Sequence, residues 1–179
     1  CLQHFLLGSI LCNDGMITAE GNLGDPTEMA LLYMAQECGT DIEALRERYP
    51  RVAEKGFDSE RKMMTTVHQA GNEVIAYSKG AAEKILENCG SMYRQGRMVD
   101  MTQSDREAVI RVQKQLMAEG RRVMALAVEL HGSLQEKGMT FLGLISMQDP
   151  VRPEALRAVE AFKQAGVSTV MITGDHPDT

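Results

Sequence analysis

The sequence has no tryptophan, only four phenylalanines and four tyrosines, and no long apolar run among its 179 residues. Its longest apolar stretches, such as residues 141–147, fall far short of the roughly 20 residues that cross a membrane. The first residues also lack the basic start and the cleavage site of a secretory signal. We therefore expect no direct membrane contact. The 44% hydrophobic content predicts a globular chain with one core, or with one core and part of a second.

Basic clusters and paired cysteines are missing as well. With 19 basic and 25 acidic residues the net charge is −6, so we expect no nucleic-acid partner. The four cysteines lie far apart without a Cys-x-x-Cys pair, which argues against a zinc knuckle or redox motif and predicts free thiols in a reducing compartment. No cluster of histidine, aspartate and glutamate residues has the spacing of metal ligands, and no Gly-x-Ser-x-Gly motif is present. The sequence thus predicts neither a metal site nor a nucleophile motif.

Helical spacing and end signals predict six helices. The clearest begins at Asp25, which suits the N-cap, with Pro26 in the first turn and Glu28 completing a capping box. A second capping box, formed by Ser104 and Glu107, begins the longest helix. The predicted helices cover residues 2–11, 25–38, 40–48, 81–89, 104–119 and 154–165.

Alternating or β-branched stretches predict the strands. Residues 61–68 and 73–79 form a predicted hairpin, joined by a turn at residues 69–72. Further strands are predicted at residues 97–101, 123–130 and 140–147. A helix pair, a hairpin and then mixed helices and strands are typical of an α+β fold, with an antiparallel sheet flanked by helices.

The composition changes at residues 149–153, where two prolines predict a stiff connector and a domain boundary. Beyond it, the predicted helix 154–165 turns Leu156, Val159 and Phe162 inward. A buried strand is predicted at residues 167–172. A helix, a tight turn and a buried strand make half of a parallel α/β unit.

Three segments carry side chains suited to chemistry, and each has a plain structural alternative. Phe57 lies in a polar stretch with cations nearby, so its ring can stack on a base, or it begins a strand and is simply buried. Lys79 and Gly80 end a strand, where lysine reaches an anion and glycine admits another molecule, or where lysine is a solvated turn residue. Residues 173–175 follow the last strand, a position that suits a phosphoryl group or an ordinary turn.

Taken in order, six stretches resemble the cytoplasmic nucleotide-binding domain of P-type cation-transporting ATPases. The likeness is to the type II pumps, and most to the calcium pumps. It covers the whole chain with the expected spacing. The matching stretches are Gly24-Asp-Pro-Thr-Glu-Met-Ala-Leu31, Phe57-Asp-Ser-Glu-Arg-Lys-Met63, Lys79-Gly-Ala81, Arg122-Val-Met-Ala-Leu126, Asp149-Pro-Val-Arg152 and Met171-Ile-Thr-Gly-Asp175.

The resemblance implies an ATP site. In the family pattern Phe57 stacks on adenine, Glu28 contacts the adenine amino group, and Lys79 with Gly80 lines the base pocket. Arg122 matches the arginine that reaches the phosphates.

Other family positions bear on the phosphates and on the neighbouring domain. Arg61 is a further candidate for a phosphate contact, although Ser59 stands where some pumps carry a basic residue. Thr173, Gly174 and Asp175 match the turn beside the phosphorylated aspartate.

The resemblance also implies a division of the chain. Residues 1–150 correspond to the nucleotide-binding (N) domain, and residues 151–179 to part of the phosphorylation (P) domain, which has a haloacid dehalogenase-like α/β fold. Neither the Asp-Lys-Thr-Gly-Thr motif with the phosphorylated aspartate nor the magnesium-binding Gly-Asp-Gly-x-Asn-Asp turn occurs in the sequence. We therefore expect the chain to bind ATP without hydrolysing it.

The implied parent is an ATP-hydrolysing membrane pump, of which this chain is a cytoplasmic piece, as its first residue, a cysteine, also suggests. Its cofactor is ATP, with Mg²⁺ as Mg-ATP in the full-length pump. Its partners are the rest of the P domain, the actuator domain and the transmembrane domain. The main alternative is an interaction module of the same fold that has lost nucleotide binding. A small haloacid dehalogenase-like phosphatase fits poorly, because the nucleophilic aspartate is missing.

Overall fold

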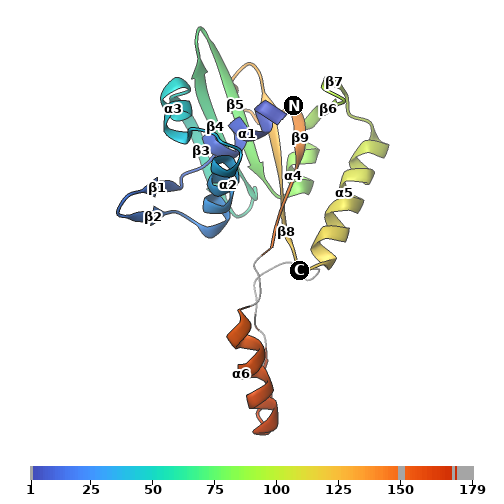
Figure 1. The fold of residues 1–179 in the computed structure, drawn as a ribbon. Helices are drawn as coiled ribbons and strands as arrows, with labels where there is room; N and C mark the ends of the chain where they lie inside the picture. The colour runs from blue at the N-terminus through green and yellow to red at the C-terminus, as the bar shows by residue number, and fades with distance from the viewer. Residues whose placement is uncertain (1, 149–151, 171, 173–179) are drawn as a thin grey trace.

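The computed structural model describes residues 2–148, 152–170 and 172, and a seven-stranded sheet lies at its centre (Figure 1). In spatial order its strands are β3 (Arg51–Asp58), β4 (Met63–Ala70), β5 (Glu73–Gly80), β8 (Arg122–Glu129), β9 (Met139–Met147), β6 (Cys89–Arg94) and β7 (Arg97–Asp100). A separate hairpin consists of β1 (Met16–Thr18) and β2 (Gly21–Leu23). The helices are α1 (Leu2–Leu11), α2 (Pro26–Glu37), α3 (Ile42–Arg48), α4 (Ala82–Glu87), α5 (Gln103–Ala118) and α6 (Pro153–Gln164).

The large sheet is mixed rather than purely antiparallel. All its neighbouring strands run antiparallel except β6 and β9, which are parallel. The cause is the connection β5–α4–β6, a helical crossover that returns the chain in the same direction, whereas a tight hairpin reverses it. The α+β prediction is confirmed for the mixture of helices and a mainly antiparallel sheet, and its purely antiparallel form is wrong.

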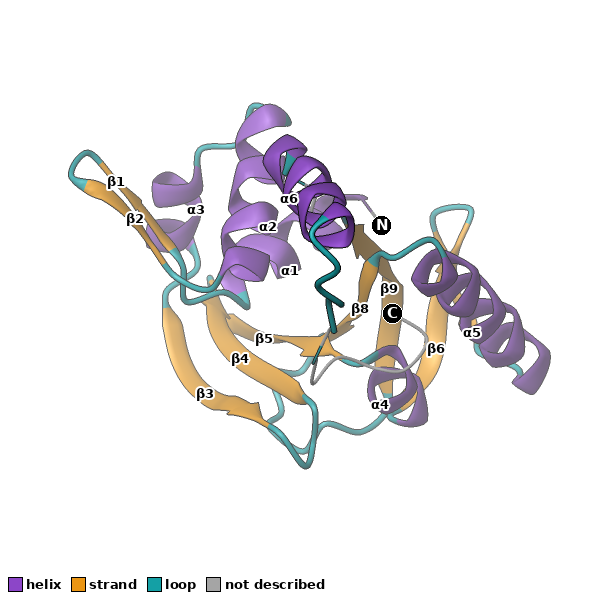
Figure 2. Ribbon diagram, turned by 90° about the horizontal axis from the view of Figure 1, so that it is seen from below, coloured by secondary structure: helices purple, strands orange, loops and turns teal. Residues whose placement is uncertain are grey.

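Helices cover both faces of the sheet, with α1 and α2 on one side and α4 and α5 toward the other (Figure 2). The alternation of side chains along β8 shows this division directly. Leu126 and Val128 belong to the core with α1 and α2, whereas Ala125 and Ala127 belong to the core with α4. Successive strand residues point to opposite faces, so a strand buried on both faces needs apolar residues at every position.

Several predicted elements are confirmed, and others differ in their ends. The first helix, the hairpin of β4 and β5, and the strands β8 and β9 lie close to their predicted positions. Strands β1, β2, β3 and β6 were not predicted, and β6 begins at Cys89, inside the helix expected over residues 81–89. The capping box of α5 is formed by Thr102 and Asp105 instead of Ser104 and Glu107. The helix begins two residues earlier than predicted because threonine is also a favoured N-cap residue, and Thr102 has an acidic partner three residues later.

The C-terminal part differs most from expectation. Helix α6 forms as predicted and lies away from the sheet in Figure 1, but Leu156, Val159 and Phe162 are 64%, 48% and 49% exposed, so the expected inward face is wrong. The described residues of 167–172 form no strand, and Ile172 is 94% exposed. A strand requires neighbours for its backbone groups, and an amphipathic helix requires a layer to cover. The described residues supply neither, and residues 173–175 lie outside them.

His68 on β4 is a buried polar residue whose environment favours the neutral ring. Its Nδ1 donates to the Tyr49 carbonyl at 2.9 Å, and its Nε2 lies 2.9 Å from the Thr66 hydroxyl. Burial is the main cause that lowers the pKa of His68 below its ordinary value of 6.5, with the charges of Arg51 and Arg46 acting in the same direction. The folded state therefore binds fewer protons at this ring than the unfolded state does.

We expect the free energy of unfolding to fall as the pH drops below about 6.5, by at most about 1.4 kcal/mol per pH unit from this ring. His68→Asn, which retains a donor near the Nδ1 position, is expected to flatten this dependence between about pH 6.5 and 5.5. Urea unfolding at several pH values measures the effect, with exposed His131 replaced by asparagine as control. An unchanged slope in His68→Asn would contradict a neutral buried ring.

Candidate functional site

The first turn of α2 begins the site. Asp25 is the N-cap, and its carboxylate accepts a hydrogen bond of 2.8 Å from the Thr27 backbone N–H. Hydrogen bonds from Thr27 hold the pKa of Asp25 below its ordinary value. Pro26 occupies the first helical position as predicted. Glu28 does not complete the predicted capping box, because its carboxylate turns toward the sheet.

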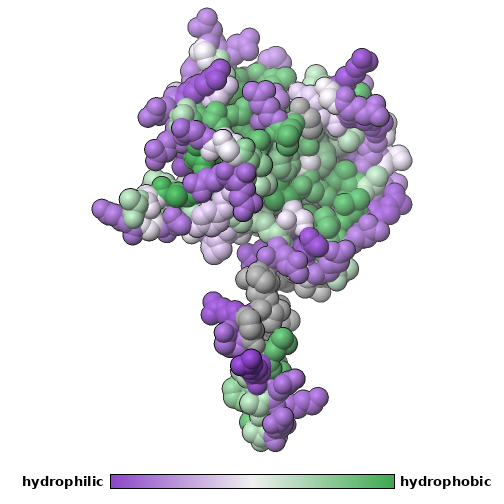
Figure 3. All heavy atoms as spheres, in the orientation of Figure 1, coloured by the Kyte–Doolittle hydropathy of each residue, from purple (hydrophilic) through white to green (hydrophobic). Residues whose placement is uncertain are grey.

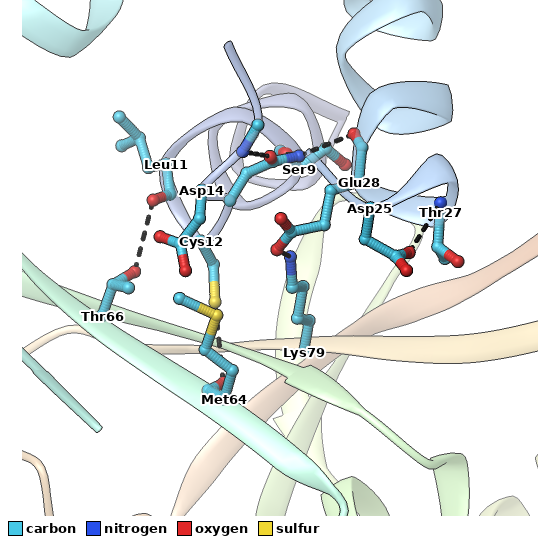
Figure 4. Close-up of polar contacts among 12 residues, drawn as sticks. Ser9, Leu11, Cys12, Asp14, Asp25, Thr27, Glu28, Met64, Thr66 and Lys79 are labelled. Atoms are coloured by element: carbon cyan, nitrogen blue, oxygen red, sulfur yellow. Dashed lines mark hydrogen bonds and ion pairs between the residues drawn. The ribbon is translucent and has the colours of Figure 1, made fainter. Parts of the chain in front are cut away.

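Glu28 forms an ion pair with Lys79 of β5, with 2.5 Å between Oε1 and Nζ, as Figure 4 shows. The side chains are 17% and 8% exposed, respectively. Lys79 points from the sheet toward the first turn of α2. The alternative of a solvated turn lysine is therefore wrong, and two of the predicted site residues are in direct contact.

Residues at the end of α1 hold this pair in place. The Asn13 side chain is buried, and its Nδ2 donates to the Ser9 carbonyl at 3.1 Å and to the Glu28 carbonyl at 2.9 Å. Cys12 lies between α1 and the sheet, where its Sγ is 3.6 Å from the Met64 carbonyl (Figure 4). Burial raises the pKa of Cys12, while the charge of Lys79 opposes this rise. The end of α1 thus fixes the first turn of α2 against β4 and β5.

Gly80 follows Lys79 and pairs with Met63 on β4. A Cβ at Gly80 would collide with the Lys62 carbonyl and would lie 2.6 Å from the Met63 Cα. The space beside Gly80 is thus filled by the neighbouring strand and not by open solvent. Glycine here permits the close approach of two backbones, and this approach brings the β3–β4 turn next to the end of β5.

A cavity of about 540 Å³ opens beside the first turn of α2 and includes Thr27 in its wall. Arg122, the first residue of β8, also lines it, and its Nη1 lies 3.4 Å from the Thr27 hydroxyl. Lys62 and Lys84 add two further cations, against one carboxylate from Glu83. The apolar part of the lining comes from Ala81, Met117, Val123, Met124 and Met147. Its size is within the range of small-molecule sites, and its charge suits an anion with an apolar portion.

Phe57 lies near the end of β3 with its side chain exposed, at 67% of its full area. The pairing of β3 with β4 is interrupted between Lys55 and Asp58, so Phe57 belongs to an irregular part of the strand. The alternative of a buried strand residue is therefore wrong. A large apolar ring left in solvent at this position suits contact with a ligand.

Arg61 faces a different hollow from the one beside Thr27. Its Nη1 pairs with the buried Glu136 carboxylate, and its Nη2 donates to the Gly56 carbonyl at 2.6 Å. Arg61, Glu136 and Lys84 contribute to the lining of this second hollow, of about 490 Å³. The structure thus brings together Glu28 and Lys79, and separately Arg122 and Thr27, at one turn of α2, and directs Arg61 elsewhere.

Comparison with known proteins identifies the family. A family model described as P-type ATPase, cytoplasmic domain N, matches residues 1–154. The chain belongs to this family. Calcium-transporting ATPase 1 of Bacillus cereus is 35% identical and cation-transporting ATPase pma1 of Synechocystis is 38% identical, each over 99% of this chain. Calcium-transporting ATPase 1 of Lactococcus lactis is 33% identical over 99% of it.

This N domain is much shorter than the proteins that it resembles. The chain spans 21% of the length of each of these three curated relatives, about a fifth. Within the described residues, none of the helices combines the length and the apolar character needed to cross a membrane.

Two residues of this N domain were missed by sequence reasoning. Lys62 lines the cavity with Arg122. It follows Arg61 directly, so the basic pair indicated a phosphate contact without showing which of the two residues makes it. Glu136 lies in a polar loop with no motif, and only the folded chain brings it to Arg61. Residues 173–175 are not described, so their predicted role beside the phosphorylated aspartate stays a prediction.

Proposed function

We propose that this N domain binds ATP and presents its γ-phosphate to the phosphorylated aspartate of a P domain outside this chain. One observation carries the proposal. The Glu28–Lys79 pair and the Thr27–Arg122 contact meet at the first turn of α2, beside a cavity with three cations and one carboxylate. A ligand with an apolar base and several phosphate charges matches this combination of surfaces.

The base belongs at the sheet side of the site. We assign the exposed Phe57 ring to stacking on adenine. Glu28 is assigned to the adenine amino group, with its carboxylate oriented by Lys79. Gly80 acts through the close pairing of β4 and β5, which keeps the β3–β4 turn beside the base pocket.

The phosphates belong at the cationic side. Arg122 and Lys62 line the cavity and are assigned to the phosphate oxygens. Arg61 is not assigned there, because its two guanidinium arms engage Glu136 and the Gly56 carbonyl. Mg²⁺ would accompany ATP on its phosphate oxygens in the full-length pump.

The parent of this N domain is proposed to be a cation-transporting, ATP-hydrolysing membrane pump, and calcium is the proposed ion. The relatives from Bacillus cereus and Lactococcus lactis, both named as calcium-transporting ATPases, support this choice. Residues 1–150 are proposed as the N domain and residues 151–179 as the beginning of the P domain. The rest of the P domain, the actuator domain and the transmembrane domain are the proposed partners, with this domain on the cytoplasmic side.

The chain alone is expected not to hydrolyse ATP, since it has no phosphorylation motif.

A titration with ATP, followed by amide chemical shifts, tests the proposal. We expect the largest shifts at Thr27, Glu28, Phe57, Gly80 and Arg122, with saturation at millimolar ATP or below. Titration with inorganic triphosphate separates the two sides of the site, because it would move Arg122 without moving Phe57. No shifts at millimolar ATP would contradict nucleotide binding and favour an interaction module of the same fold.

A further inference from the structure

Glu136 is a buried carboxylate in the loop between β8 and β9. Its side chain is 9% exposed, and its φ of 56° is a left-handed conformation that few residues other than glycine adopt. The carboxylate accepts a hydrogen bond of 2.7 Å from the Thr65 hydroxyl and pairs with Arg61, while the Lys55 Nζ lies 3.7 Å away. A buried carboxylate is stable only with such partners, so this loop is tied to the end of β3 and β4.

Arg61 extends this connection to the backbone beside Phe57. One arm of its guanidinium meets Glu136, and the other donates to the Gly56 carbonyl at 2.6 Å. In the described sheet β3 is an edge strand, and its pairing with β4 is interrupted between Lys55 and Asp58. Arg61 therefore supplies a backbone contact at the point where the regular pairing is interrupted. A planar guanidinium bridges the two groups with two separate nitrogens held in a rigid fork, whereas a lysine has only one nitrogen to share between them.

We propose that Glu136 is a positioning residue for nucleotide binding, which acts through Arg61 to hold the Gly56–Phe57 segment so that the Phe57 ring is presented to adenine. This inference rests on the proposed function, because it assigns the same ring to the base. It gives Arg61 a role different from the phosphate contact that the resemblance implied. It also explains why a carboxylate is buried in a loop that contributes no residue to the cavity beside Thr27.

The two roles for Arg61 predict different ligand dependence. If Glu136 and Arg61 position Phe57, then their loss weakens the binding of ATP and of adenosine by the same factor. If Arg61 contacts a phosphate, its loss weakens ATP binding and leaves adenosine binding unchanged. Arg61→Lys keeps the charge but loses the two-armed bridge, so we expect it to behave like Arg61→Ala for both ligands.

Glu136→Ala is expected to weaken the binding of ATP and adenosine roughly 3- to 10-fold, measured by amide shift titration. The same change in a Phe57→Ala background is expected to have no further effect on affinity. Glu136→Gln keeps the shape of the side chain and an acceptor oxygen for Arg61, so we expect an intermediate loss of affinity. This variant also provides the test if Glu136→Ala folds poorly. Glu60→Gln, which removes an exposed negative charge from the same turn, is the matched control and should retain wild-type affinity.

A readout without nucleotide separates this inference from the proposed function. In the free protein, ¹⁵N relaxation of the Gly56 and Phe57 amides should show increased motion in Glu136→Ala and not in Glu60→Gln. Wild-type protein that binds no ATP would refute the proposed function and with it the role assigned to Glu136, even if the motion increases. Wild-type binding that falls in Phe57→Ala but not in Glu136→Ala or Glu136→Gln would overturn this inference alone. A loss in Glu136→Ala that persists at full size in the Phe57→Ala background would overturn it as well.

Discussion

Lys79→Met is expected to lower the free energy of unfolding by about 3 kcal/mol and to weaken ATP binding strongly. Methionine is about as long as lysine but has no charge. The substitution therefore leaves Glu28, which is only 17% exposed, without its cation. Removing one partner of a buried ion pair is costly because the remaining charge is still shielded from water. Denaturant unfolding and an ATP titration measure the two effects.

A second substitution separates stability from binding. In the double variant Lys79→Met with Glu28→Gln, the unpaired charge is gone, and we expect most of the stability to return. ATP binding should stay weak, because neither side chain of the base pocket is then native. Arg121→Met is the control, since it breaks an exposed ion pair with Glu119 and should cost less than about 1 kcal/mol. Equal losses in Lys79→Met and Arg121→Met would contradict the burial of the Glu28 pair.

Phe57→Ala is expected to weaken ATP binding by about 1–3 kcal/mol, or roughly 5- to 150-fold, through the loss of base stacking. The ring is 67% exposed and contributes little to the core. Its removal should therefore change the free energy of unfolding by no more than about 0.5 kcal/mol. Phe57→Ala should thus lower the ATP affinity, from shift titration, at nearly unchanged stability, from denaturant unfolding, whereas Lys79→Met should lower both.

Val52→Ala is the matched control for Phe57→Ala. Val52 lies on the same strand, is apolar and is 54% exposed. It is expected to retain wild-type affinity, because it lies at the other end of β3. A Phe57→Ala protein with unchanged ATP affinity would show that the ring is an ordinary exposed residue and not a stacking surface.

The local parts of this structure could be predicted from the sequence because their causes are local. Asp25 caps α2 and Pro26 fits its first turn, so these two residues alone predict where the helix begins. The turn around Gly71 likewise sets the hairpin of β4 and β5. The resemblance assigned ligand-binding roles to Phe57, Lys79 and Arg122, but it gave no contacts between the side chains of the site. The ion pair of Lys79 with Glu28 depends on two elements that are 51 residues apart in the sequence.

The remaining differences have causes that no short stretch contains. The parallel pairing of β6 with β9 depends on where the crossover through α4 ends, and β3 is a polar edge strand with weak alternation. Residues 167–172 have the composition of a buried strand, yet a strand requires partners that the described chain does not supply. Glu136 lies 75 residues from Arg61, and its importance arises only from the contact that the fold creates.

We propose that ATP binds between the end of β3, the first turn of α2 and the start of β8. Intermolecular nuclear Overhauser effects between the adenine H2 and H8 protons and the protein, recorded at saturating ATP, test it most directly. We expect contacts from adenine to the Phe57 ring. Adenine contacts to Met16 and Ile17, which line a separate groove of about 510 Å³ beside α3, without contacts to Phe57, would contradict it.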